Sequence, residues 1–208
     1  MADRPDPTAA ARADTRADAM RDRLLDASIV VFGRRGYEDA RVEDICQAAG
    51  TARATFYRYF SGKDDVFDAL LVQLLAELDV ISAEVEAVTP DRAGFETLRD
   101  FVAHFLLVSE RWSPVVEALS VPRRVPSEQR DKATASIVRI SRRLGASIEA
   151  GATTAGDANN QAMAVVALVE GVGHQLRTWD IPFEREALLD AITTLALRML
   201  HPGTLVVG

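Results

Sequence analysis

The chain has 208 residues, almost half of them hydrophobic, and a formal net charge of -7. This length is enough for one or two domains with a buried core, and the single cysteine excludes an internal disulfide framework. Because there is no signal peptide and no apolar run approaches the roughly 20 residues that span a bilayer, we expect a soluble, cytoplasmic protein.

The first 17 residues are rich in Ala, Asp, Arg and Pro and contain no large apolar residue after Met1. Such a segment cannot bury enough apolar surface to order itself, so we expect a disordered amino-terminal arm over residues 1–17. The alternative is an arginine arm that enters a DNA minor groove, which the interspersed aspartates disfavour.

Residues 41–63 predict two short helices separated by a turn. In the first helix, apolar side chains recur at the spacing i, i+3, i+4, i+7: Val42, Ile45, Cys46 and Ala49. Gly50 ends this helix, because glycine adopts the left-handed conformation without strain. The second helix begins near Ala52. The pattern indicates a helix-turn-helix unit, whose second helix enters the DNA major groove.

The charge distribution favours the same segment as a DNA-contacting surface. From Ile45 to Lys63 there are three basic residues and no acidic one. Residues 1–63 carry a net charge of +1, and residues 64–208 carry -8. Phosphate neutralisation supplies most non-specific affinity for DNA, so we expect contact through the amino-terminal part and modest non-specific binding.

Residues 22–70 resemble the DNA-binding head of the TetR family of transcriptional repressors. The likeness rests on a helix that ends before Gly36-Tyr37, an Ile-x-x-x-Ala-Gly pattern at 45–50, Thr-Phe-Tyr-x-Tyr-Phe at 55–60, and Lys63 before the next helix. The resemblance implies a ligand-responsive regulator that binds an inverted-repeat operator of double-stranded DNA as a homodimer. The implied regulator is a repressor released by a small, largely apolar effector.

Two positions depart from the family pattern. Arg41 stands at the start of the second helix, where the family has Thr, and Ala52 stands where the recognition helix has Ser. Thr51 is therefore the expected cap. The resemblance implies these DNA-contacting residues: Arg41, Thr51, Arg53, Thr55, Tyr57, Arg58 and Lys63. Each cation taken singly is also consistent with a solvated surface residue.

Beyond the head, apolar side chains follow a helical period and no strand alternation occurs. The predicted helices cover residues 64–88, begin at Asp91, Ser113, Ser127 and Asp157, and cover residues 183–200. We therefore expect an all-α protein of about nine helices. Residues 18–63 form the helix-turn-helix head, residues 64–203 form an effector-binding and dimerisation body, and residues 204–208 form a tail.

The last two predicted helices carry more apolar surface than one core needs. A helix that is apolar on more than one side must be covered on more than one side. The resemblance implies a four-helix dimer interface built from this pair, with Val169, Gly173, Leu188, Ile192, Leu195 and Met199. A twofold dimer presents two recognition helices about 34 Å apart, or a multiple of this distance.

The body also contains aromatic residues with polar residues near them in sequence. The resemblance implies an effector pocket in the body, and small-molecule sites are generally apolar with a few polar groups. The candidate ligand residues are Phe101, His104, Phe105, Trp112, Met163, Glu170, His174 and Trp179. For each of the aromatic residues, plain core packing is the alternative.

Two other function classes remain open at this stage. One is a helical hydrolase or transferase that uses His104 or His174, although the sequence has no phosphate loop, nucleophile elbow or metal-ligand spacing. The other is an acidic helical carrier or interaction protein without specific DNA binding. We expect no catalytic residue, no cofactor and no metal.

Overall fold

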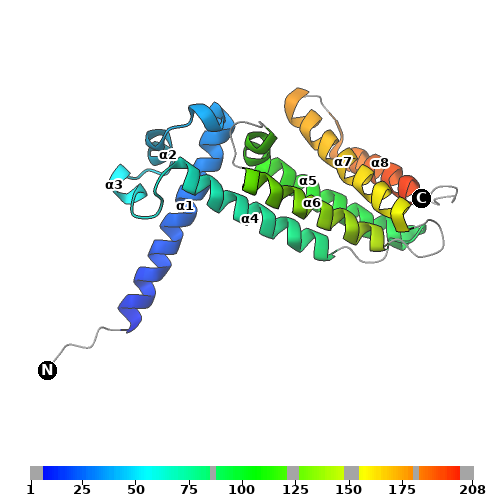
Figure 1. Cartoon of the computed structure of the whole chain (residues 1–208), viewed down its shortest axis with the longest axis horizontal. Helices are drawn as coiled ribbons and strands as arrows, with labels where there is room; N and C mark the ends of the chain where they lie inside the picture. The colour runs from blue at the N-terminus through cyan, green and yellow to red at the C-terminus, as the bar shows by residue number, and fades with distance from the viewer. Residues whose placement is uncertain (1–6, 85–87, 121–126, 148–154, 180–182, 202–208) are drawn as a thin grey trace. The chain divides into compact units, whose positions relative to one another are not determined.

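The computed structural model describes residues 7–84, 88–120, 127–147, 155–179 and 183–201, and these ranges form eight helices (Figure 1). The helices are α1 Pro7–Asp39, α2 Val42–Ala48, α3 Arg53–Phe56, α4 Lys63–Glu84, α5 Arg92–Ser120, α6 Ser127–Ser147, α7 Ala155–Trp179 and α8 Arg185–Leu200. The expected all-α architecture is confirmed. No helix in the described ranges combines the length and hydropathy that a bilayer crossing requires.

The chain divides into two compact units. The first, here called the head unit, comprises Met1–Val72 and Pro114–Arg124, and the second, the body unit, comprises Gln73–Ser113 and Val125–Gly208. The division falls inside α4, whereas the sequence predicts a boundary at residues 63 and 64.

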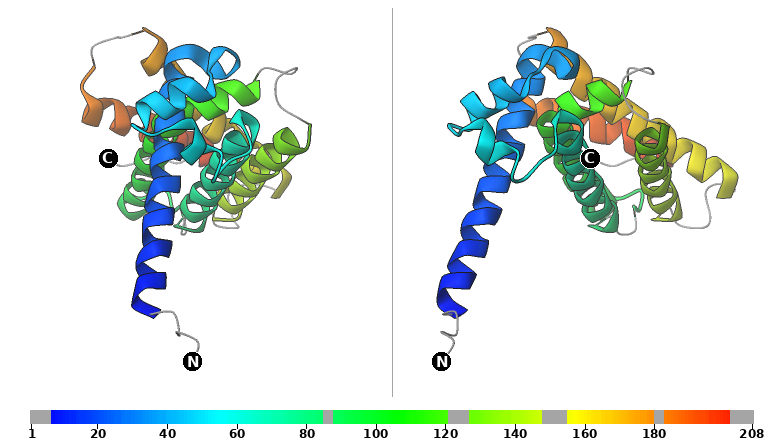
Figure 2. Two further views of the ribbon diagram at one scale, coloured as in Figure 1. Left: turned by 90° about the vertical axis from the view of Figure 1, so that its left-hand side faces the viewer. Right: turned by 60° about the vertical axis from the view of Figure 1, so that its left-hand side comes forward.

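In the head unit, α1 is the longest helix, and its amino-terminal turns extend beyond α2 and α3 (Figures 1 and 2). It begins at Pro7, within the segment for which composition predicts a disordered arm. Gly36 breaks the helix with a φ of 75°, as expected for a helix that ends before Gly36-Tyr37. The side chains of Leu24, Leu25 and Phe32 on α1 are fully buried.

Tyr37, which follows this break, joins the end of α1 to the start of α4. Its ring packs against Phe32 and Phe67, with centroids 5.3 and 4.9 Å away. Its hydroxyl donates a hydrogen bond to the Asp64 carboxylate. Burial and this hydrogen bond raise the pKa of Tyr37 above its ordinary value, so the phenol stays protonated.

The separate helix expected from Ser113 does not exist, because α5 continues through Pro114 to Ser120. Proline has no N–H, so the carbonyl of Glu110 loses its backbone donor four residues on. The hydroxyl of Ser113 donates to that carbonyl over 3.2 Å and replaces the missing bond. Ser113, which we expected to start a new helix, therefore stabilises the interior of α5 instead. As a result, the described ranges contain eight helices rather than nine.

The core of the body unit lies between α5, α6, α7 and α8. α7 packs against α6 and α8. The fully buried side chains include Leu98, Trp112, Ile140, Leu144 and Leu197. At the end of α8, the Nε2–H of His201 donates to the carbonyl of Val88 over 2.7 Å, which fixes this end against the segment that precedes α5.

Candidate nucleic-acid interface

The turn between α2 and α3 is built on Gly50, which has a φ of 60°. An added Cβ at this position would lie 2.8 Å from the Arg23 guanidinium, and that guanidinium donates to the Gly50 carbonyl over 3.2 Å. The positive φ favours glycine here. The predicted turn is confirmed, and Arg23 fixes it to α1.

The cap of α3 differs from the expected one. Ala52, not Thr51, is the N-cap residue, and no side chain accepts a hydrogen bond from the first turn. The Thr55 N–H of this turn donates instead to the main-chain carbonyl of Ala52 over 2.9 Å. The helix is short, although main-chain bonds from Tyr57, Tyr59 and Phe60 continue the turns beyond Phe56.

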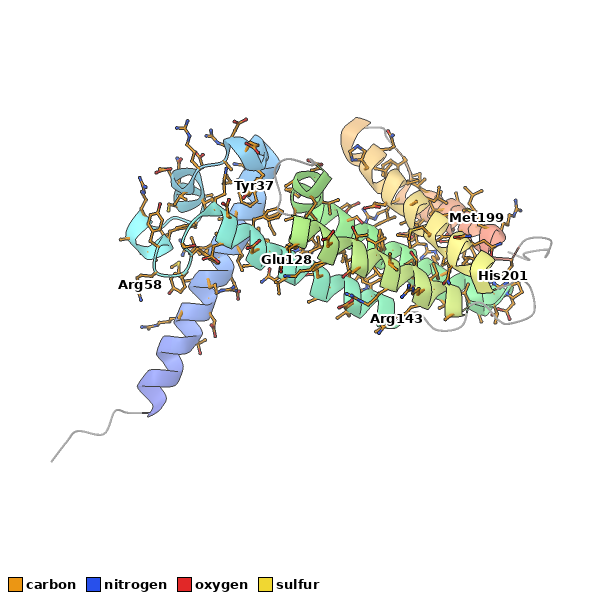
Figure 3. All side chains as sticks on the ribbon, viewed as in Figure 1. Tyr37, Arg58, Glu128, Arg143, Met199 and His201 are labelled. Atoms are coloured by element: carbon orange, nitrogen blue, oxygen red, sulfur yellow. The ribbon has the colours of Figure 1, made fainter. Side chains whose placement is uncertain are left out.

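The side chains of α3 and the turns that follow it separate into a buried and an exposed set. Phe56 and Phe60 are at most 3% exposed, and their rings lie 5.9 Å apart. Arg53, Tyr57 and Arg58 are exposed. Figure 3 shows Arg58 at the outer surface of the head unit. This division gives the head an outward surface that contains two guanidinium groups and a phenol.

Arg53 forms an ion pair with Glu43, which precedes the stretch from Ile45 to Lys63 that has no acidic residue. Its NH1 lies 2.5 Å from Glu43 Oε1 on α2, and its NH2 donates to the Tyr57 hydroxyl over 3.5 Å. The hydrogen bond with Tyr57 and the charge of Glu43 raise the pKa of Arg53. A DNA phosphate that binds Arg53 must therefore compete with Glu43.

Lys63 has a structural partner as well as its predicted role at DNA. Its Nζ donates to the main-chain carbonyls of Tyr37 and Glu38 over 2.8 and 2.9 Å, and lies 4.7 Å from the centroid of the Tyr37 ring. An ammonium has three N–H donors, so two of the three are used within the head.

The other predicted DNA contacts also belong to the head unit. Arg41 is exposed just before α2, where its N–H donates to Asp44. Thr51 and Thr55 are half-buried, and the Arg58 guanidinium lies 5.9 Å from the centroid of the Tyr59 ring. Sequence reasoning missed the roles of Glu43 and Tyr37, and their partners, 10 and 27 positions away, give no sequence signal.

The eight predicted ligand residues can be compared with the lining of one cavity. The part of the chain that the structure describes contains a cavity between α5, α7 and α8, and none of the eight residues lines it. Phe101, Phe105 and Trp112 are buried, and the Trp112 indole donates to Glu77 over 2.8 Å. His104 and Glu170 are half-buried.

The remaining three candidates, Met163, His174 and Trp179, belong to α7. The sulfur of Met163 accepts a hydrogen bond from Ser141 on α6 over 3.5 Å. His174 is exposed. The Trp179 side chain lies outside the described residues.

The predicted dimer residues are distributed between the interior and the surface of the body unit. Val169, Gly173 and Ile192 are buried within the chain, and Leu188 and Met199 are partly exposed. Leu195 is 52% exposed.

Comparison with known proteins identifies the head. Residues 24–70 match the model of the bacterial regulatory proteins of the tetR family. An uncharacterised helix-turn-helix transcriptional regulator of Bacillus subtilis, YvdT, is 31% identical over 96 residues, which are 46% of this chain and 48% of that protein. The match thus spans about half the length of this relative.

Solved structures extend the likeness of the fold to the body. A transcriptional regulator from Rhodococcus has a TM-score of 0.70 at 23% identity, over 90% of this chain and 99% of its own. The TetR-family regulator PfmR from Thermus thermophilus has a TM-score of 0.64 at 22% identity, over 84% and 97%. At these identities the likeness concerns the fold.

The matched family consists of regulatory proteins, which favours a regulator over the enzyme alternative. Three observations indicate a DNA-binding head: the turn at Gly50, the exposed cationic surface that follows it, and the family match of residues 24–70. Residues 24–70 thus have the head sequence of the TetR family of bacterial transcriptional regulators, and the all-helical fold is similar to that of solved regulators.

Proposed function

We propose that the protein is a repressor that binds an inverted-repeat operator as a twofold dimer and leaves it when a small, largely apolar effector binds. The observation that carries the DNA-binding part is the outward surface of Arg53, Tyr57 and Arg58 above the buried Phe56 and Phe60. Cations and hydroxyl groups on a recognition helix contact phosphates and base edges.

Surface composition supports a dimer through α7 and α8. The exposed positions of α7 include Ala164, Ala167 and Gly171, and those of α8 include Ala187, Ala191 and Leu195. Small exposed residues permit close helix contact, and apolar helix faces that stay in water favour association. A twofold axis through these helices makes the interface self-complementary.

The effector part of the proposal follows from linkage. A ligand shifts the equilibrium between two states only if it binds them with different affinity. Release of the operator therefore requires an effector that prefers the DNA-incompetent form, and the operator weakens effector binding by the same factor.

A gel-shift assay with genomic fragments tests DNA binding. Arg53→Ala with Arg58→Ala should abolish retention of the selected fragment while sedimentation velocity still reports a dimer. Unchanged retention would favour the carrier or interaction protein instead. Selected fragments should contain an inverted repeat.

The dimer is tested separately by a charge in the proposed interface. Leu195→Asp should give a monomer in sedimentation velocity and weaken operator binding. Val80→Asp is the matched control, because Val80 on α4 is 55% exposed and lies outside α7 and α8. A dimer that survives Leu195→Asp would contradict this interface.

A further inference from the structure

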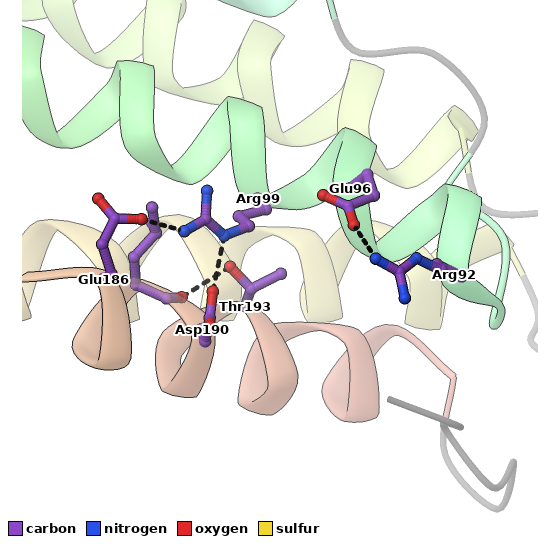
Figure 4. Close-up of polar contacts among 7 residues, drawn as sticks. Arg92, Glu96, Arg99, Glu186, Asp190 and Thr193 are labelled. Atoms are coloured by element: carbon purple, nitrogen blue, oxygen red, sulfur yellow. Dashed lines mark hydrogen bonds and ion pairs between the residues drawn. The ribbon is translucent and has the colours of Figure 1, made fainter.

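Two arginines of the chain are held in different ways. Arg99, in the body unit, donates from Nε to Asp190 over 2.6 Å and from NH2 to Glu186 (Figure 4). Its side chain is only 24% exposed, and this pairing connects α5 to α8. Arg53, in the head unit, has one carboxylate partner, and its side chain is 59% exposed. The first arrangement joins two helices, whereas the second presents a guanidinium group to a partner outside the chain.

Arg53 keeps donors for such a partner. A guanidinium group has five N–H donors. NH1 of Arg53 pairs with Glu43 on α2, and NH2 donates to the Tyr57 hydroxyl over 3.5 Å. The guanidinium carbon also lies 5.9 Å from the centroid of the Tyr57 ring. These contacts orient the group from two sides and use two of its five donors.

Glu43 affects the kind of acceptor that Arg53 binds. Its carboxylate lies 2.5 Å from NH1 of Arg53, and it repels a phosphate because both groups carry a negative charge. The O6 and N7 atoms of guanine accept hydrogen bonds without a formal charge, so they are repelled less. Phosphates are alike along a duplex, whereas base edges differ. Glu43 therefore favours a base over a phosphate, and weakening the unwanted contact raises specificity.

The neighbours of Arg53 in the chain present methyl groups. Ala52 and Ala54 are both exposed, and an alanine side chain forms no hydrogen bond. Alanine is among the weakest residues at the N-cap position that Ala52 occupies, and departures from such local rules are expected at functional sites. In the major groove, an alanine methyl group packs against the C5-methyl group of thymine.

We propose that each operator half-site contains a guanine next to a thymine. Arg53 donates to O6 and N7 of the guanine, and the methyl groups of Ala52 and Ala54 contact the thymine methyl group. Glu43 acts through Arg53, as a positioning residue that disfavours phosphate contact. This inference rests on the proposed function, because it names the base pairs that the DNA-binding head prefers.

Selection from a pool of randomised duplexes with the full chain identifies the preferred bases. We expect each enriched half-site to contain a guanine with a thymine beside it. Half-sites without this pair of bases would overturn the inference and leave the proposed function standing. Enrichment of no duplex at all would overturn both.

Base analogues in the enriched duplex test the two contacts separately and leave the protein unchanged. Uracil lacks the C5-methyl group of thymine, and 7-deazaguanine lacks N7. In fluorescence anisotropy, uracil should lower the affinity about three- to fourfold, as expected for one buried methyl group. The deazaguanine should lower it at least about fivefold. Unchanged affinity with either analogue would overturn the inference.

Variants assign the methyl contact to residues. Ala52→Gly with Ala54→Gly removes both methyl groups, so the thymine and uracil duplexes should bind this protein equally well. The comparison is made within one variant, so a general loss of affinity cancels. Ala76→Gly, at an exposed position of α4, is the control and should keep the preference for thymine. A preference for thymine that survives the double substitution would overturn the assignment.

Glu43→Gln tests the positioning role. Its affinity for a scrambled duplex should rise by about fivefold and its affinity for the enriched duplex by only about twofold, so the ratio of the two affinities falls. Asp39→Asn removes the same charge outside the ion pair and should leave this ratio unchanged. A ratio that stays constant in Glu43→Gln would overturn the role of Glu43 in specificity.

Discussion

The Nζ atom of Lys63 lies 2.8 Å from the main-chain carbonyl oxygen of Tyr37, where α1 ends and α4 begins. Carbonyls at a helix end have no intrahelical donor and carry a partial negative charge. An ammonium group satisfies both needs. The lysine implied as a phosphate contact thus also holds two helices of the head unit together.

Replacing Lys63 by methionine should destabilise the protein. A hydrogen bond to a charged group contributes about 1.5 to 3 kcal/mol, and we expect a loss of about 2 kcal/mol in the free energy of unfolding. Urea unfolding measures it. Arg58→Met is the control, since Arg58 is exposed: it should weaken DNA binding without changing stability. Equal stability of both variants would remove the structural role of Lys63.

Replacing Glu43 by glutamine should strengthen DNA binding. The change releases Arg53 from its 2.5 Å ion pair and removes a negative charge that opposes phosphate. An exposed pair is worth up to about 1 kcal/mol, so we expect affinity to rise by about two- to fivefold in fluorescence anisotropy. Asp39→Asn removes the same charge outside this pair and should have a smaller effect. Equal gains in both variants would indicate that only the net charge matters.

Replacing Ser113 by alanine should weaken α5. The Glu110 carbonyl then loses the donor that replaces the missing N–H of Pro114, at a cost of about 1 kcal/mol. Ser109→Ala in the same helix is the control. In a Pro114→Ala background, Ser113 should contribute nothing to the free energy of unfolding, because the backbone N–H of residue 114 again donates to the Glu110 carbonyl. Additive effects in this double-mutant cycle would contradict the repair role.

The carboxylate of Asp91 should make stability depend on pH. It accepts hydrogen bonds from the Thr89 hydroxyl over 2.6 Å and from the Gly94 N–H over 3.0 Å, and these bonds lower its pKa below the ordinary 3.8. A lowered folded pKa means that the contribution is present above 3.8 and is lost as pH falls through the folded value.

The stability difference between the natural chain and Asp91→Asn should therefore be largest near neutral pH and shrink in acid. Chemical unfolding at about pH 7 and about pH 3 measures the two differences. A constant difference between these two pH values would show that the charge of Asp91 makes no contribution.

The parts of the fold that local sequence determines were predictable. The turn at Gly50 needs a residue that tolerates positive φ, and the buried Phe56 and Phe60 follow from helical spacing. The break at Gly36 has the same local origin. Helix periodicity likewise predicts the long helices of the body.

The features that the sequence did not predict are of two kinds. Some are contacts between residues that come together only in the folded chain, and others depend on which hydrogen-bond partner a side chain takes. Glu43 precedes the acid-free segment, yet folding brings it to Arg53. Ser113 has the composition of a cap, but its hydroxyl bonds backwards to Glu110. Thr51 does not cap α3 as expected, because the N-cap position of this helix is occupied by Ala52. Partner choice of this kind leaves no periodic signal.

Cys46 is 4% exposed, and burial raises the pKa of its thiol. Thiol reagents attack the thiolate, so the natural sequence is close to inert toward maleimides and methanethiosulfonates. A spin label attached through Ala54→Cys, at an exposed position of α3, would need no cysteine-free background. In a symmetric dimer, one label on each protomer would give a single interspin distance. That distance would report how far apart the two α3 helices lie with and without ligand.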